Sequence, residues 1–168
     1  LRTFFELIEH LPRFLHVAVD LPQSGTFEVA GPVLDKALYI LRRLNRQLVP
    51  KGLCLLPIRY LGRQALLYLY RPAELRRDLE SETAQDILQQ AGYPCGGCQR
   101  CVAKLIRRFR GSGEFPHEVG LFLSYPPEDV KGFIEHRACD FKCAGLWKVY
   151  GDVEKARRMF DQFKKCTE

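Results

Sequence analysis

The sequence contains no hydrophobic run that approaches the length of a membrane-spanning helix, which needs about 20 apolar residues. It also shows no secretory signal, because charged side chains interrupt every apolar stretch within the first twenty residues. No internal repeat, low-complexity tract or linker divides the 168 residues. We therefore expect a single domain over residues 1–168 that is located in the cytoplasm and has no membrane partner.

Several familiar functional patterns are missing as well. A zinc-protease helix would need a second histidine four positions after His117, but Leu121 stands there. The glycines at 96–97 and 111–113 lack the Lys–Ser/Thr pair of a phosphate loop and the spacing of a dinucleotide-binding turn, so we interpret both as plain turns. No nucleic-acid-binding motif is present, and nucleic acid is not expected as a partner.

The composition is otherwise that of a globular protein, with 46% hydrophobic residues. A formal net charge of +6 would help a surface meet an anionic partner, so a protein or a small anionic ligand is the expected kind of partner. Seven cysteines make the chain cysteine-rich. Because no secretory signal is visible, these thiols are expected to be reduced and not to form a disulfide framework.

Hydrophobic periodicity and turn residues predict a mixture of strands and helices. Strands are expected at 14–19, 53–60, 64–71 and 146–150, and helices around 34–48, 75–79, 81–91, 98–110, from 127 and from 153. Pro57 removes a backbone donor, so its strand is expected at a sheet edge or with a bulge. This order predicts an α+β fold, in which a small, mainly antiparallel sheet of three to four strands is covered by helices. A ferredoxin-like topology with a helical insertion is one arrangement that fits.

The chemically richest stretch runs from Phe115 to Val130. It combines the pair His117–Glu118 with a Tyr–Pro–Pro turn, and it lies between a group of three cysteines and a second group of two. Most of the chemically versatile side chains therefore fall in this part of the chain. A functional site is expected here, although the pattern does not name a substrate.

Cys95, Cys98 and Cys101 are separated by two-residue gaps just before a predicted helix. Thiolates at this spacing can converge on zinc or on an iron–sulfur cluster, because the glycines between the first two let the loop fold around it. Alternatively, Cys101 is a small buried helix residue and the other two are loop thiols. A fourth metal ligand could be supplied by Cys139, Cys143 or His117.

A thiol-dependent enzyme is the second interpretation. Cys139 or Cys143 would act as the nucleophile, with nearby Lys142 favouring the thiolate, and His117 would act as the base. Glu118 completes the set of candidate catalytic residues. This mechanism requires the fold to bring one of these cysteines beside His117. The alternative is that the cysteines are half-buried packing residues and that His117 caps a helix or makes a structural hydrogen bond.

Several long motifs, in the same order, resemble a family catalogued as domain of unknown function 3793. The matching segments are Arg43–Arg46, Val49–Leu53, Leu67–Pro72, Gly92–Pro94, Phe115–Val130, Lys131–Glu135 and Trp147–Asp152. They extend from about Leu41 to the C-terminus, roughly three-quarters of the chain. The resemblance implies no established activity, so it supplies no catalytic residues.

The first thirty residues depart from this family pattern. Members begin with a segment like His-Cys-Ala-Pro-Thr-Leu-Ala-Gly, which is absent from residues 1 to about 30. We therefore expect residues 1–30 to form a divergent N-terminal region. No role that depends on the opening His–Cys pair can be assigned to this chain.

Taken together, the sequence predicts a non-catalytic module that binds a ligand or a partner, with a thiol-coordinated metal as one option. A thiol-dependent enzyme that uses Cys139 or Cys143 with His117 is the alternative. Both hypotheses require cysteines that are distant in sequence to meet near His117.

Overall fold

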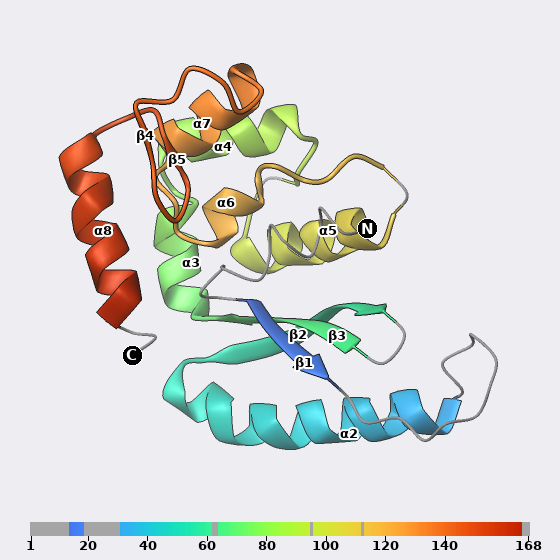
Figure 1. The fold of residues 1–168 in the computed structure, drawn as a ribbon. Coiled ribbons are helices and arrows are strands. Elements are labelled where there is room, and N and C mark those ends of the chain that lie inside the picture. Colours follow the sequence, from blue (N-terminus) through green and yellow to red (C-terminus); the bar gives the residue numbers. More distant parts are fainter. Residues whose placement is uncertain (1–13, 19–30, 62–63, 95, 112, 166–168) are drawn as a thin grey trace. The chain divides into compact units, whose positions relative to one another are not determined.

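The computed structural model of the protein describes residues 14–18, 31–61, 64–94, 96–111 and 113–165 (Figure 1). The chain divides into two compact units. The first unit consists of Arg13–Ala73, and the second consists mainly of Glu74–Glu168. The expectation of a single domain over the whole chain stays a prediction, and most of the N-terminal region that was expected to be divergent lies outside the described residues.

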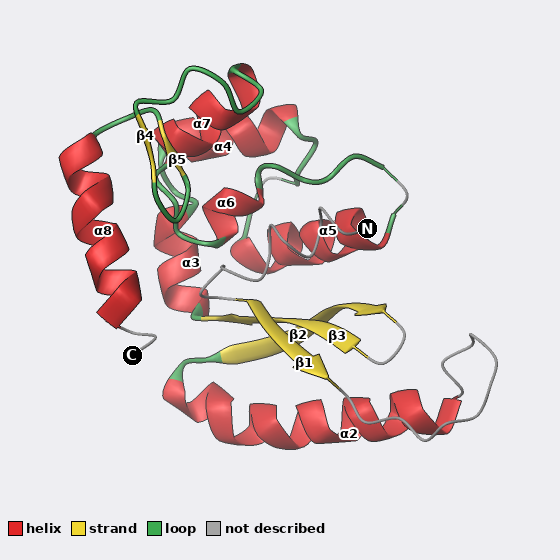
Figure 2. Ribbon diagram, in the orientation of Figure 1, coloured by secondary structure: helices red, strands yellow, loops and turns green. Residues whose placement is uncertain are grey.

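The first unit is a three-stranded sheet with one long helix (Figure 2). Along the chain its elements are β1 (Phe14–Ala18), α2 (Gly31–Leu48), η1 (Val49–Lys51), β2 (Cys54–Leu61) and β3 (Gln64–Tyr70). Strand β3 lies between β1 and β2 and is antiparallel to both. Because α2 connects β1 to β2, this unit is a split β-α-β arrangement.

Strand β2 confirms the expectation for Pro57. It lies at an edge of the described sheet, and its pairing with β3 shifts register between Pro57 and Arg59. The exposed edge of β2 is partly covered by a side chain of α2. The amide group of Asn45 donates to the carbonyl oxygen of Leu55 at 2.7 Å and accepts from the backbone N–H of Leu55 at 2.9 Å. Such pairing gives an edge strand the hydrogen bonds that a neighbouring strand would otherwise supply.

The second unit is mainly helical. After α3 (Pro72–Asp78), within which the chain passes from the first unit to the second, its elements are α4 (Glu82–Gln90), α5 (Cys98–Arg110), α6 (Val119–Phe122), α7 (Pro127–Glu135), β4 (Cys143–Ala144), β5 (Lys148–Val149) and α8 (Val153–Lys165). The side chain of Ser81, the first residue of the helix predicted at 81–91, accepts a hydrogen bond from the backbone N–H of Ala84 and caps α4. A core cluster of Trp147, Val149, Ala156 and Phe160 joins the β4–β5 hairpin to α8.

The α+β class is confirmed, but the last predicted strand pairs differently from the ferredoxin-like arrangement. In the described residues β5 pairs antiparallel with β4 and forms a separate hairpin, so the main sheet keeps the three-stranded order β1-β3-β2. A close approach explains why this hairpin packs on α8. A Cβ at Gly145 would overlap the ring of Phe160, so the turn and the helix touch through a bare backbone. No helix in the described part of the chain combines the length and apolarity that crossing a bilayer requires.

Candidate functional site

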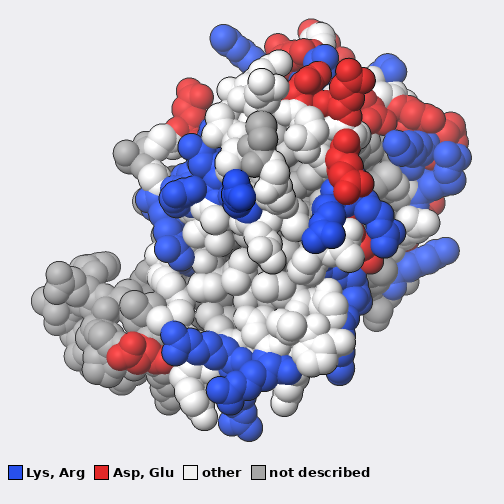
Figure 3. Space-filling model, turned by 180° about the vertical axis from the view of Figure 1, so that it is seen from behind, with Lys and Arg blue, Asp and Glu red and all other residues white. Residues whose placement is uncertain are grey.

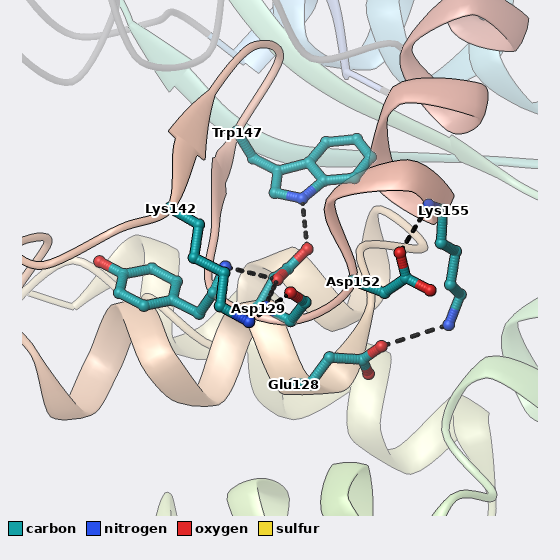
Figure 4. Close-up of polar contacts among 8 residues, drawn as sticks. Glu128, Asp129, Lys142, Trp147, Asp152 and Lys155 are labelled. Carbon is teal, nitrogen blue, oxygen red and sulfur yellow. Dashed lines mark hydrogen bonds and ion pairs between the residues drawn. The ribbon is translucent and has the colours of Figure 1, made fainter.

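Asp129 is a charged residue in the core of the second unit, where it is only 2% exposed. Its oxygen Oδ2 accepts a hydrogen bond from the indole Nε1 of Trp147 at 2.7 Å (Figure 4). Its oxygen Oδ1 accepts from the backbone N–H groups of Tyr150 and Gly151 at 2.8 and 2.7 Å. A carboxylate that has lost its water needs such donors. Asp129 therefore fixes the β4–β5 hairpin and the turn that follows it to the first turn of α7.

A glycine lets α7 and the segment after β5 come close enough for these bonds. A Cβ at Gly132 would overlap the Cβ and ring of Tyr150, so only glycine fits at this position of α7. The contact joins two of the segments on which the family resemblance rests, Lys131–Glu135 and Trp147–Asp152. The hydrogen bonds of Asp129 add the Phe115–Val130 segment, so three of the matching segments meet at one junction.

Beside this junction the second unit contains a pocket of about 450 Å³, which we call the Trp147 pocket. Its wall is largely apolar and draws on the 115–130 stretch, on α7 and on the β4–β5 hairpin. Its polar side chains are few. The aromatic rings in the wall are those of Phe115, Tyr125, Phe133 and Trp147, and the polar or charged side chains are those of His117, Asp129 and Lys148.

The indole of Trp147 is held on several sides by other rings. The ring of Tyr125 stacks on it with 4.4 Å between the centroids, and the ring of Phe160 meets it edge-on at the same centroid separation. The hydroxyl of Tyr125 is buried and has no hydrogen-bond partner among the described residues. Burial raises the pKa of Tyr125, so its ring remains a neutral phenol.

The loop between α7 and β4 has a strained backbone. Arg137, Ala138 and Asp140 have φ angles of 48°, 64° and 56°, in the left-handed region that costs a residue with a Cβ about 1–2 kcal/mol. The ammonium group of Lys148 donates to the carbonyl oxygen of Ala138 at 2.7 Å and lies 4.6 Å from the centroid of the Phe141 ring. Because Ala138 and Lys148 both line the Trp147 pocket, this strained loop forms part of its wall.

His117 is exposed and lies near the rings of Phe115 and Phe133, at centroid separations of 5.5 and 5.2 Å. Within the described part of the chain no hydrogen bond or ion pair joins it to a cysteine. Cys139 is exposed in the loop after α7, whereas Cys143 packs against the cluster around Trp147. No contact among the described residues therefore supports the catalytic Cys–His pair, which stays a prediction.

Glu118 anchors a buried network instead of facing the Trp147 pocket. Its Oε1 accepts a hydrogen bond from the hydroxyl of Tyr93 at 2.7 Å and lies 3.0 Å from Nε of Arg108. Arg108 also donates to the carbonyl oxygen of Ala91 at 3.1 Å. Burial, and secondly the charge of Glu118, raise the pKa of Tyr93, so the phenol stays protonated and acts as the donor. Glu118 thus ties the segment after α4 to α5 and α6.

A second pocket, of about 390 Å³, shares Phe115 and His117 with the Trp147 pocket. It lies among α4, α5 and α7, and both signs of charge line it. The cationic side chains are Arg108 and Lys131, and the acidic ones are Asp86, Glu114, Glu118 and Glu135. In the view from behind, acidic side chains gather over the part of the second unit that contains α4 and α7 (Figure 3).

The predicted thiol site is only partly described. Cys98 and Cys101 lie one turn apart at the start of α5, are both buried, and line a pocket of about 310 Å³. Gly96 and Gly97 precede them with φ angles of 89° and 123°, which favour glycine. Cys95 lies outside the described residues, and among those that are described no three histidine, cysteine or acidic side chains are grouped to hold a metal. The three-thiol site stays a prediction.

The sequence family described as "Protein of unknown function (DUF3793)" matches residues 17–168. The chain belongs to this family. No curated protein and no solved structure matches the chain. The family match begins upstream of Leu41, the point from which the motifs predicted it, so residues 17–30 belong to the DUF3793 region. In this DUF3793 protein the walls of the Trp147 pocket come largely from three of the segments that resemble the family, 115–130, 131–135 and 147–152.

The residues that sequence reasoning missed are Asp129 as an anchor, Trp147 and Lys148. The sequence predicts a helix from residue 127 and assigns no contact to the carboxylate of Asp129 within it. Two features of the sequence could have indicated the anchor. Asp129 follows two prolines and precedes the apolar residues of the helix, and the single tryptophan of the chain lies in another matching segment. Nothing in the spacing of these residues showed that they would meet.

Asp129→Asn is expected to lower the free energy of unfolding by about 3 kcal/mol, because an amide NH₂ would face an N–H donor and leave it unsatisfied in the core. Urea unfolding followed by the fluorescence of Trp147, the only tryptophan, measures this. The matched control is Asp161→Asn on the exposed surface of α8, where a change within about 0.5 kcal/mol is expected. Equal losses in the two variants would contradict the anchoring role of Asp129.

Proposed function

We propose that this DUF3793 chain is a non-catalytic binding module, and that its ligand is a small molecule with a flat, apolar body that enters the Trp147 pocket. The observation that carries the proposal is the pocket itself, about 450 Å³ with an aromatic wall and few polar groups. Pockets of roughly 300–1,000 Å³ with this character are typical of small-molecule sites. An aromatic or alicyclic ligand would match the wall best.

The energetics favour such a ligand. Each square ångström of apolar surface that leaves water contributes about 25 cal/mol. Ring pairs in stacked or edge-on geometry add about 0.5–1.5 kcal/mol beyond this. Trp147 is already fixed by its hydrogen bond to Asp129 and by the stacked ring of Tyr125, so little side-chain freedom remains to be lost on binding.

The polar groups of the Trp147 pocket support binding more than catalysis. Both oxygens of Asp129 already accept hydrogen bonds from N–H donors, so this carboxylate is not free to act as a base. Among the described residues that line the pocket there is no cysteine, so a thiol nucleophile would have to come from elsewhere. The ordinary role of such groups is to orient a ligand.

Ala144→Leu is expected to weaken binding of the neutral dye Nile red at least roughly tenfold, because the added methyl groups would fill space in the pocket. Ala144 is exposed and lines the pocket, so the change removes no core packing. Quenching of Trp147 fluorescence during titration, together with dye emission, reports binding at this site. The matched control is Ala103→Leu, at an exposed position of α5 outside the pocket.

The Ala103→Leu variant should bind Nile red within about twofold of the unchanged protein. Equal binding by the two variants would place the dye elsewhere and contradict the proposal. An absence of saturable binding by the unchanged protein would contradict it as well.

We propose as a second function that Cys98 and Cys101, with Cys95, hold zinc or an iron–sulfur cluster. The support is the spacing of the three thiols and the arrangement of the two that are described. Cys98 and Cys101 are buried and lie one helical turn apart, and the two glycines that precede them in the sequence have positive φ angles. When bound, zinc would tie the loop to α5, and a cluster would add electron transfer.

Protein purified without oxygen is expected to contain stoichiometric zinc or iron by elemental analysis, and the double variant Cys98→Ser/Cys101→Ser is expected to lose it. The matched control is Cys54→Ser in β2, which should keep the metal. Metal-free unchanged protein, or equal metal content in all three proteins, would show that these thiols are not ligands.

A further inference from the structure

Lys148 differs from Lys131 and Lys155 of the second unit in the kind of group that its ammonium contacts. Lys155 forms an ion pair with Glu128 at 3.2 Å, and Lys131 lies 3.9 Å from Glu135. Lys148 is half-buried, and its contacts in the described part of the chain are a neutral carbonyl, that of Ala138, and an aromatic ring. No carboxylate among the described residues pairs with it. Its positive charge is therefore uncompensated at the wall of an apolar pocket.

The acidic side chain in the same wall does not cancel this charge through a direct contact. Asp129 directs its two oxygens to Trp147 Nε1 and to two backbone N–H groups. A half-buried cation beside an apolar cavity favours a ligand that brings the opposite charge, because their attraction is screened less than in bulk water. The polar end of a ligand in this pocket is therefore expected to be anionic.

We propose that the ligand of the Trp147 pocket is an aromatic carboxylate, and that Lys148 is the residue that binds its carboxylate group. This inference rests on the proposed function, because it assigns a chemical class to the ligand of the same pocket. The aromatic body lies among Tyr125, Phe133 and Trp147. The carboxylate accepts a charge-assisted hydrogen bond from Nζ of Lys148, a bond roughly twice as strong as one between neutral groups.

The geometry leaves room for this bond without disrupting the loop. A lysine ammonium group carries three N–H donors, and the carbonyl oxygen of Ala138 takes one of them. That bond fixes the position of Nζ beside Ala138, another residue that lines the pocket, before a ligand arrives. Lys148 therefore offers further donors from a position that is already ordered, which lowers the entropy cost of binding.

The charge of the second pocket makes it unsuitable for an anionic ligand. Its four acidic side chains outnumber its two cationic ones, and Glu118 already pairs with Arg108. An organic anion would be repelled there, whereas an organic amine would be attracted. The two pockets share Phe115 and His117, so both offer an aromatic surface to a probe. The sign of charge on the probe therefore distinguishes binding in one pocket from binding in the other.

Three probes with the same ring test the inference: naphthoate, naphthylmethanol and naphthylmethylamine, titrated against Trp147 fluorescence. Naphthoate is expected to bind about tenfold more tightly than the alcohol, because only the carboxylate adds the attraction of opposite charges to its hydrogen bond with the ammonium group. The amine is expected to bind the Trp147 pocket most weakly. In Lys148→Gln, naphthoate should lose its advantage over the alcohol, and binding of the alcohol should be unchanged.

The matched control is Lys142→Gln. Lys142 belongs to the same hairpin region and also donates to a backbone carbonyl at 2.7 Å, that of Gly151, but it does not line the pocket (Figure 4). This variant should keep the tenfold preference for naphthoate. A general loss of positive charge from the hairpin would weaken naphthoate binding equally in both variants, and that outcome would overturn the assignment of Lys148.

The remaining outcomes separate this inference from the proposed function. If all three probes bind equally well, or if Lys148→Gln keeps the preference for naphthoate, the ligand is not recognised through this lysine, and the proposed binding function stands. If Lys148→Gln abolishes binding of the alcohol too, Lys148 acts only by shaping the pocket, and the inference fails. If none of the probes binds the unchanged protein, both the inference and the proposed function fail.

Discussion

A buried carboxylate determines how the second unit is put together. Asp129 has almost no contact with solvent, and the donors that satisfy it come from a side chain and two backbone groups located 18, 21 and 22 residues further along the chain. Taking a charge out of water costs several kcal/mol unless such donors are in place. The hairpin and the turn after it are therefore held in one position on α7. This constraint also positions Trp147 and Lys148, which both line the pocket.

The contacts at this junction show what several of the segments that resemble the family do in the structure. The 115–130 stretch supplies the carboxylate and half of the aromatic wall, α7 supplies a glycine that lets Tyr150 approach, and the 147–152 segment supplies the donors. A segment in the first unit has a comparable role, because Asn45 in α2 satisfies the backbone of Leu55 at the edge of β2. These positions need a particular functional group and not only an apolar side chain, which accounts for motifs that periodicity alone does not explain.

Local features of the fold could be predicted from the sequence. The bounds of α5, the cap at Ser81, and the edge position and register shift at Pro57 follow from periodicity and from the chemistry of single residues. Long-range features could not. The prediction of three to four strands left the place of the last strand open, because composition suits a strand but does not identify its partner. In the structure that partner is the two-residue strand β4, a few positions upstream. For the site, the sequence favours the cysteines, because the chemistry of thiols is versatile. Asp129 and Lys148 derive their importance from contacts that only the folded chain reveals.

The most direct test of this account is the hydrogen exchange of the indole N–H of Trp147, observed by nuclear magnetic resonance. A single tryptophan gives a single indole signal. The account predicts that this proton exchanges slowly, that the backbone N–H groups of Tyr150 and Gly151 are protected with it, and that Asp129→Asn accelerates all three while the amide of Leu105 in α5 stays protected. Rapid exchange of the indole proton in the unchanged protein, or protection that survives the loss of the carboxylate, would contradict it.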